Sequence, residues 1–228
     1  MKHKILTLLL AMTAVTTAMA QDEPLYRREI GIGVGMTNYL GDFNSSLAKG
    51  MQPAFSLVYR RTFSPYCGLR FDLGYTQLKG SSADVTTYYP DYAEEPYTFK
   101  RSMTDFNIVF EYNFWPYGTG RDYRGAKRLT PYVFAGIGMT VASGNDAGSS
   151  VGANVPLGIG LKYKVGQRVN LGLEWGVHIS TSDELDGRKD PYSIKSSGIF
   201  KNTDCYSSLR ATLTYSFSAK CRTCNKYD

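Results

Sequence analysis

The sequence predicts an all-β protein, an eight-stranded antiparallel transmembrane β-barrel. Three observations support this prediction: eight segments alternate apolar and polar residues, their connections are alternately short and long, and glycine falls on the polar face of the segments. A period of two means that each segment separates an apolar environment from a polar one.

The first four predicted strands have clear alternation. The first, about 29–39, places glycine at every second position between large apolar residues. The second, near 51–63, reads MQPAFSLVYRRTF, and the third, 67–78, opposes Leu, Phe and Tyr to Arg, Asp, Gly and Thr. The fourth, 102–115, opposes Phe and Ile to Asp, Asn and Glu.

The last four predicted strands continue the pattern. The fifth and sixth, 129–142 and 151–165, each contain a Gly-Ile-Gly sequence. The seventh, 169–180, has six apolar residues on one face and Asn, Gly, Glu, Gly, His and Ser on the other. The eighth, 205–217, repeats this alternation and ends in an aromatic residue. Strands of roughly 11–14 residues are long enough to cross a bilayer when tilted.

The connections have the unequal lengths of outer-membrane barrels. Those after the second and sixth strands are minimal, whereas those after the third and seventh run to about twenty residues.

The glycines decide which face points inward. A soluble barrel of the lipocalin kind would place its apolar face inside, and a membrane barrel reverses this. Glycine is disfavoured at exposed strand positions, whereas the narrow interior of an eight-stranded barrel needs small residues beside large ones. The polar face, which carries most of the glycines, is therefore expected to point inward. These glycines are Gly31, Gly33, Gly35, Gly74, Gly136, Gly138, Gly158, Gly160, Gly172 and Gly176.

The glycines of the first strand do not form a phosphate-binding loop. Met36 stands where the dinucleotide motif needs its third glycine, and no Gly-Lys-Ser/Thr closes a Walker sequence. The sequence predicts no catalytic, cofactor-binding or metal-binding residues.

The N-terminal residues 1–20 have the features of a secretory signal peptide. Lys2 and Lys4 precede an apolar core, which ends in the small-x-small sequence Ala-Met-Ala. Residues 21–218 are then expected to form an outer-membrane barrel, and 219–228 a Cys-bearing periplasmic tail. Both termini are expected in the periplasm, and nucleic acid is an implausible partner there.

Charged residues are expected inside the barrel. They either line a conducting pore or fill the lumen as ion pairs; the small diameter of eight strands favours the filled lumen. The sequence does not show which acid meets which base. The predicted inward charges are Arg60, Arg70, Asp72, Asp105, Glu111, Lys162, Glu174 and Arg210.

His178 and Ser180 lie two residues apart on one face of the seventh strand. The spacing resembles the His-Ser pair of outer-membrane lipid A 3-O-deacylases, in which a serine nucleophile needs a base within hydrogen-bond reach. The alternative is a polar pair in the lumen, and we favour it because His178 shares its face with Glu174. The acidic residues of the following loop lack EF-hand spacing, so a solvated loop is expected there. They are Asp183, Glu184, Asp186 and Asp190.

The predicted topology separates the cysteines. Cys67 is expected at the periplasmic rim with Cys221 and Cys224 of the tail, whereas Cys205 is expected at the outer rim, too far away to bond with Cys67. Three cysteines on one side leave open a Cys221–Cys224 bridge, a bridge from Cys67 to the tail, or a bond to a partner.

The expected periplasmic face is basic, which suits either ordinary solvation or docking of an acidic partner. The basic residues of the connection 116–128 and of the tail are Arg121, Arg124, Lys127, Arg128, Lys220, Arg222 and Lys226.

Three segments resemble a known family. EIGIGVGMTNYLGDFN resembles the G-x-x-x-G-x-x-x-Y-x-G-D opening of the PorG-like outer-membrane barrels. PAFSLVYRRTFSPYCGLRFDLGYTQLKG resembles their second hairpin, and TDCYSSLRATLTYSFSAKCRTC resembles their last strand and Cys-bearing tail. The resemblance implies a non-enzymatic component of the type IX secretion apparatus that associates with the periplasmic ring-forming lipoprotein PorK and its partner PorN.

Overall fold

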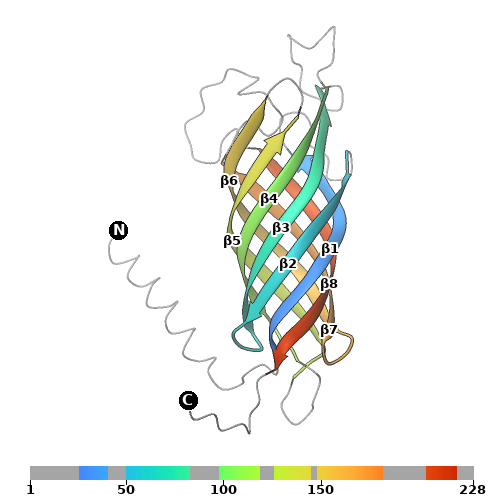
Figure 1. The fold of residues 1–228 in the computed structure, drawn as a ribbon, viewed down its shortest axis with the longest axis vertical. Helices are drawn as coiled ribbons and strands as arrows, with labels where there is room; N and C mark the ends of the chain where they lie inside the picture. The colour runs from blue at the N-terminus through green and yellow to red at the C-terminus, as the bar shows by residue number, and fades with distance from the viewer. Residues whose placement is uncertain are drawn as a thin grey trace, which may run out of the picture.

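The chain forms a closed barrel of eight antiparallel strands in sequence order, which confirms the predicted fold class (Figure 1). A computed structural model describes residues 26–40, 50–82, 98–118, 126–144, 148–181 and 204–219. The strands are β1 Tyr26–Leu40, β2 Gln52–Thr62, β3 Cys67–Ser81, β4 Thr98–Asn113, β5 Leu129–Ser143, β6 Ser149–Lys164, β7 Val169–Ser180 and β8 Cys205–Ala219.

Pairing between the first and last strands closes the sheet. β1 and β8 pair from Tyr26 opposite Ala219 to Leu40 opposite Cys205. Closure leaves no free strand edge, so the backbone groups of all eight strands have a neighbouring strand on each side. The strands are tilted relative to the long axis of the barrel (Figure 1).

The two ends of the barrel differ in their connections. The end that carries Tyr26 and Ala219, here called the turn end, has the short connections 63–66 and 165–168 and the longer 114–128. The opposite end, here called the loop end, has the connections 41–51, 82–97, 144–148 and 181–204. The predicted contrast holds for the short connections 63–66 and 165–168 and for the long connections 82–97 and 181–204, whereas 114–128 and 144–148 depart from it. The expected signal peptide lies outside the described residues.

The inner and outer faces of the wall have the predicted polarity over most of its height. Large apolar side chains are exposed on the outside, among them Ile137 at 69% and Ile159 at 56%. Glycine on the inner face makes room for large neighbours: a Cβ added to Gly160 would lie 2.6 Å from the ring of Tyr132. An apolar outer wall around a polar interior is the arrangement of a membrane barrel.

The polarity is reversed at the loop end of β3 and β4, which the sequence analysis did not predict. There the inner face is apolar and buried, with Tyr39, Leu78 and Phe99 at 2% exposure or less. The outer face is polar: Lys79 and Lys100 lie directly opposite each other on β3 and β4, and both are exposed. β4 accordingly begins at Thr98, before the predicted residue 102, because this upper part is built like the wall of a water-facing barrel.

The described part of the chain contains no helix long and apolar enough to cross a membrane.

Candidate functional site

Ionisable side chains fill the middle of the barrel. All eight charged residues that the sequence placed inside are buried, with exposures of 6% or less, and Glu29 and Lys164 join them. Groups buried in this way need charged or hydrogen-bonding partners, because an unpaired buried charge is strongly unfavourable.

The lower part of the network is centred on Glu111 of β4. Its Oε2 lies 2.8 Å from Nε of Arg60 and 2.5 Å from Nζ of Lys162. Arg60 also pairs with Glu29 of β1, with 2.5 Å between Nη1 and Oε2. Lys162 donates a further hydrogen bond to Asn113 at 3.0 Å. These contacts connect β1, β2, β4 and β6 across the lumen.

The upper part of the network is centred on Glu174 of β7. Glu174 pairs with Arg70 of β3 and, at 2.6 Å, with Nη2 of Arg210 of β8. Asp72 lies 2.9 Å from Nε of Arg70 and 3.2 Å from Nη2 of Arg210. The hydroxyl of Tyr132 donates a hydrogen bond of 2.7 Å to Glu174. Arg70 reaches Glu111 at 3.2 Å and so joins the two parts of the network.

The buried charges of the described residues balance. Six acidic and six basic residues are buried, and every acidic residue that the structure describes is among them. The acids are Glu29, Asp72, Asp105, Glu111, Glu174 and Asp204, and the bases are Arg60, Arg70, Arg101, Lys162, Lys164 and Arg210. The interior is thus neutral when all are ionised.

The connection between β4 and β5 contributes to closing the lumen at the turn end. Its Tyr117 donates a hydrogen bond of 3.1 Å to Asn170, which points inward from β7. The ammonium of Lys164 lies 5.4 Å from the centroid of the Tyr117 ring. Burial raises the pKa of Tyr117 above its ordinary value, so the phenol stays neutral and can donate this bond.

An apolar plug occupies the lumen at the loop end. Tyr39 and Phe99 meet edge to face, with ring centroids 5.1 Å apart, and Leu78 and Met103 are buried with them. Tyr39 also donates a hydrogen bond of 2.5 Å to Asp204. Below the plug, a cavity of about 10 Å³ lies beside Asp105, which is enough for about one water molecule. The lumen is therefore filled rather than open.

His178 and Ser180 both lie inside the barrel, as expected for a polar pair in the lumen. They are 3% and 1% exposed, and the imidazole stacks on the ring of Tyr206, with centroids 4.4 Å apart. Nδ1 of His178 has no hydrogen-bond partner among the described residues. Neither side chain reaches the outer wall, where a membrane lipid would have to be attacked.

The two described cysteines lie at opposite ends of the barrel, as predicted. Cys67 begins β3 at the turn end, and Cys205 begins β8 at the loop end. Cys221 and Cys224 lie outside the described residues, as do the acidic residues 183–190.

The exposed charges of the described residues are all basic. Of the predicted docking residues, Lys127 and Arg128 are exposed at the turn end; Arg121, Arg124, Lys220, Arg222 and Lys226 lie outside the described residues. The structure adds three exposed arginines near the same end, which the sequence reading did not single out. They are Arg28, Arg61 and Arg168. Their positions on the outward parity of β1 and β2, and in the β6–β7 turn, were the signal that could have identified them.

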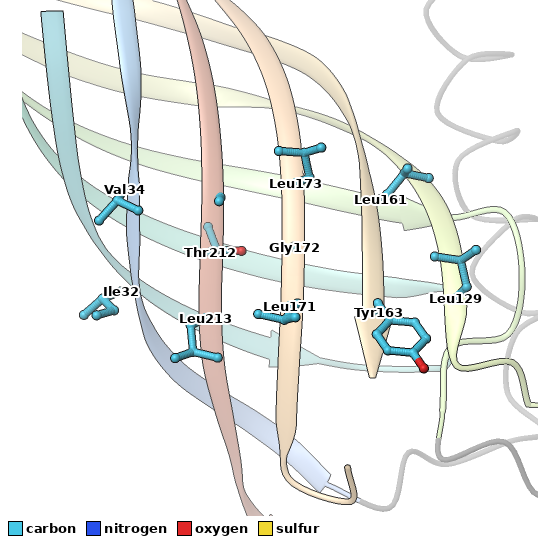
Figure 2. A pocket seen from close by; sticks show the side chains of 11 residues that line it. Ile32, Val34, Leu129, Leu161, Tyr163, Leu171, Gly172, Leu173, Thr212 and Leu213 are labelled. Atoms are coloured by element: carbon cyan, nitrogen blue, oxygen red, sulfur yellow. The ribbon is translucent and has the colours of Figure 1, made fainter. Parts of the chain in front are cut away.

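A shallow groove of about 580 Å³ crosses the outer wall (Figure 2). Its walls are apolar side chains of β5 to β8 and β1, including Leu161, Leu171 and Leu213, and its floor includes Gly172. Figure 2 shows these side chains around the backbone of Gly172, whose Cα hydrogens replace an inward-pointing side chain beside Thr212. Among the described residues, no three His, Cys, Asp or Glu side chains are placed to hold a metal ion.

Solved structures with a similar fold are outer-membrane barrels. Neisserial surface protein A has a TM-score of 0.51 and 14% identity, with 83% of this chain and 97% of that chain covered. The outer membrane protein OprG from Pseudomonas aeruginosa has a TM-score of 0.47 and 9% identity, covering 87% and 99%. The N-terminal β-barrel domain of Pseudomonas aeruginosa OprF has a TM-score of 0.45 and 12% identity, covering 83% and 98%. At 14% identity, the similarity to Neisserial surface protein A supports the fold and carries no information about function.

No curated protein matches the chain. A family model does match, over residues 3–226, which is nearly the whole sequence, and it is described as a domain of unknown function, DUF6089. The chain therefore belongs to the DUF6089 family.

Proposed function

We propose that this protein is an outer-membrane barrel with no enzymatic activity that anchors a periplasmic ring of the type IX secretion apparatus. In this proposal the turn end and both termini face the periplasm, and the ring is of the PorK and PorN kind. The PorG-like segments of the sequence supply the identity of the apparatus.

The filled lumen is the observation that carries the non-catalytic, non-conducting part of the proposal. Ten buried charged residues in the middle of the barrel, with Tyr117 below and the apolar plug above, occupy the space that a solute or substrate would need. In this proposal the protein acts through its surfaces. The apolar outer wall contacts lipid, and the ends of the barrel bind partner proteins.

The basic turn end supports docking of an acidic partner. Lys127 and Arg128 are exposed there, and no acidic residue of the described segments is exposed beside them. Lys127 lies 4.6 Å from the centroid of the Trp115 ring, which holds the cation at the surface. Local positive charge accelerates association with an acidic surface.

The test is complementation of a deletion strain. We expect the deletion to abolish secretion and to be rescued by the wild-type gene. The variant Lys127→Glu/Arg128→Glu should fail to rescue and should recover less of the ring lipoprotein in a pull-down from detergent-solubilised membranes. The matched control, Lys79→Glu/Lys100→Glu, makes the same charge change at the loop end and should rescue. Normal secretion in the deletion strain would exclude the proposed role.

The enzymatic alternative is tested in the same strain. His178→Ala and Ser180→Ala should restore secretion and leave the acylation pattern of lipid A unchanged in mass spectra. Altered acylation with Ser180→Ala would support a lipid A-modifying enzyme instead.

A further inference from the structure

Arg168 lies immediately below the apolar groove of the outer wall. It belongs to the short β6–β7 turn, and its Nη1 donates a hydrogen bond of 2.8 Å to the hydroxyl of Tyr215 on β8. Its guanidinium carbon is 5.6 Å from the centroid of the Tyr26 ring. Tyr215 is the next outward residue after Leu213, which lines the groove. The guanidinium of Arg168 therefore lies next to the end of the apolar groove on the outer wall.

Arg168 is one of three cations around this part of the rim, here called the arginine row: Arg28, Arg61 and Arg168. Arg28 lies directly opposite Arg61 on β2 and opposite Phe217 on β8. Both arginines are exposed on the outer face, and like charges placed directly opposite each other are destabilising. Every acidic residue of the described segments is buried, so none of them compensates this row.

The arginine row lies on the side of the barrel, at the border of the apolar wall. Phe63, Val169 and Tyr215 lie beside it with exposures of 49%, 38% and 45%. Aromatic and basic residues at the edge of an apolar band are typical of the membrane–water interface. A docked protein would meet the end face around Lys127 and Arg128, whereas the arginine row is at the level of lipid headgroups.

We propose that the arginine row and the groove form a binding site for an anionic phospholipid. The headgroup phosphate lies on Arg168, with Arg28 and Arg61 adding positive charge, and one acyl chain lies in the groove over Gly172 (Figure 2). Guanidinium groups suit this role because they bind phosphate through two parallel N–H groups. The proposal rests on the membrane placement given above, but not on the secretion role.

The test is lipid retention by the full-length mature protein, folded in detergent with equal amounts of phosphatidylglycerol and phosphatidylcholine and examined by native mass spectrometry. The wild type should retain phosphatidylglycerol preferentially. Arg168→Gln should reduce this preference roughly fivefold, the effect of one cation near an anionic surface. Lys100→Gln, which removes an exposed cation at the loop end, should leave it unchanged. Equal retention of the two lipids by the wild type, or an unchanged preference in Arg168→Gln, would overturn the site.

A second variant tests the groove. Ala211 lines the groove and is exposed, so Ala211→Phe fills it without changing charge. It should lower retention of both lipids while keeping the preference for phosphatidylglycerol; retention equal to wild type would exclude the groove as the acyl site. If Arg168→Gln does not fold, as judged by heat-modifiable gel mobility, Arg28→Gln/Arg61→Gln takes its place, and its loss of preference should be at least as large because it removes two cations.

The two proposals fail separately. Lipid preference is measured on the purified protein without ring components, so its absence leaves the secretion role standing. Loss of secretion activity in the Lys127→Glu/Arg128→Glu variant, with lipid preference intact, would separate the docking face from the lipid site.

Discussion

Glu174 shows how single residues hold the lumen closed. It contacts Arg70, Arg210 and Tyr132, which come from three other strands, and its side chain is 2% exposed. Removing one member of a buried ion-pair network leaves the remaining charges without partners. The resulting loss of folding stability is larger than the net stability that the ion pair contributes.

We therefore expect Glu174→Gln to lower the free energy of unfolding by about 3–5 kcal/mol. Urea unfolding in detergent micelles, followed by tryptophan fluorescence, measures this change. The matched control is Asp105→Asn, since Asp105 is buried in the same lumen and makes no ion pair within 4 Å among the described residues. Equal losses in the two variants would contradict the importance of the network around Glu174.

At the scale of the strand, β3 and β4 each pass from a lipid-facing part to a water-facing part without a change in their alternation. β3 and β4 keep the same in-and-out parity along their whole length, but the polarity of the two faces is exchanged near the loop end. Leu78 is buried inside and Lys79 is exposed outside, whereas lower on the same strand Asp72 is inside and Leu73 is outside. The lower part is built for lipid and the upper part for water.

This difference predicts that a change of charge on the outer wall has a large effect in the apolar band and a small effect near the loop end. Ile159→Lys places a charge in the apolar band and should destabilise the barrel by roughly 2–4 kcal/mol in lipid bilayers. Lys100→Leu, an exchange on the same face nearer the loop end, should change stability by less than about 0.5 kcal/mol. Urea titration of the folded fraction in vesicles measures both, and similar effects in the two variants would refute the change of solvent along the wall.

Individual strands show how far the sequence could be read. Alternation predicted all eight strands, and the position of the glycines predicted the inward direction of residues such as Arg70 and Glu174. It could not predict that these two residues meet, because they are 104 positions apart and their contact depends on the tilt and stagger of the closed sheet. The reversed polarity at the loop end left a readable signal, since Leu78 and Phe99 have inward parity beside the outward Lys79 and Lys100. The groove and the arginine row required the order of strands around the barrel.

For the molecule as a whole, the filled lumen predicts an electrically silent barrel. The purified protein should give no stepwise conductance in planar bilayers at neutral pH, because paired side chains occupy the lumen between Tyr117 and the apolar plug. Unitary currents that scale with salt concentration would contradict this expectation. A porin inserted under the same conditions serves as the positive control.

The proposed orientation is tested by thiol labelling in intact cells. In a background with all four cysteines changed to serine, Lys79→Cys should react with a membrane-impermeant maleimide in intact cells. Arg168→Cys should react only after the outer membrane has been permeabilised, because the two positions are at opposite ends of the barrel. Labelling with the reverse pattern would invert the orientation and remove the docking face from the periplasm.

The water-facing upper wall of β3 and β4 has a further consequence for the connection that begins there. Beyond Tyr75, β3 continues for several residues to Ser81, paired with β4, and strands rise by about 3.3 Å per residue. The segment between β3 and β4 thus starts from a strand extension that rises roughly 10–15 Å above the apolar band, once strand tilt is allowed for. Insertions or exchanges in that segment should be accommodated above the strand extension, so its sequence is free to change without disturbing how the barrel sits in its bilayer.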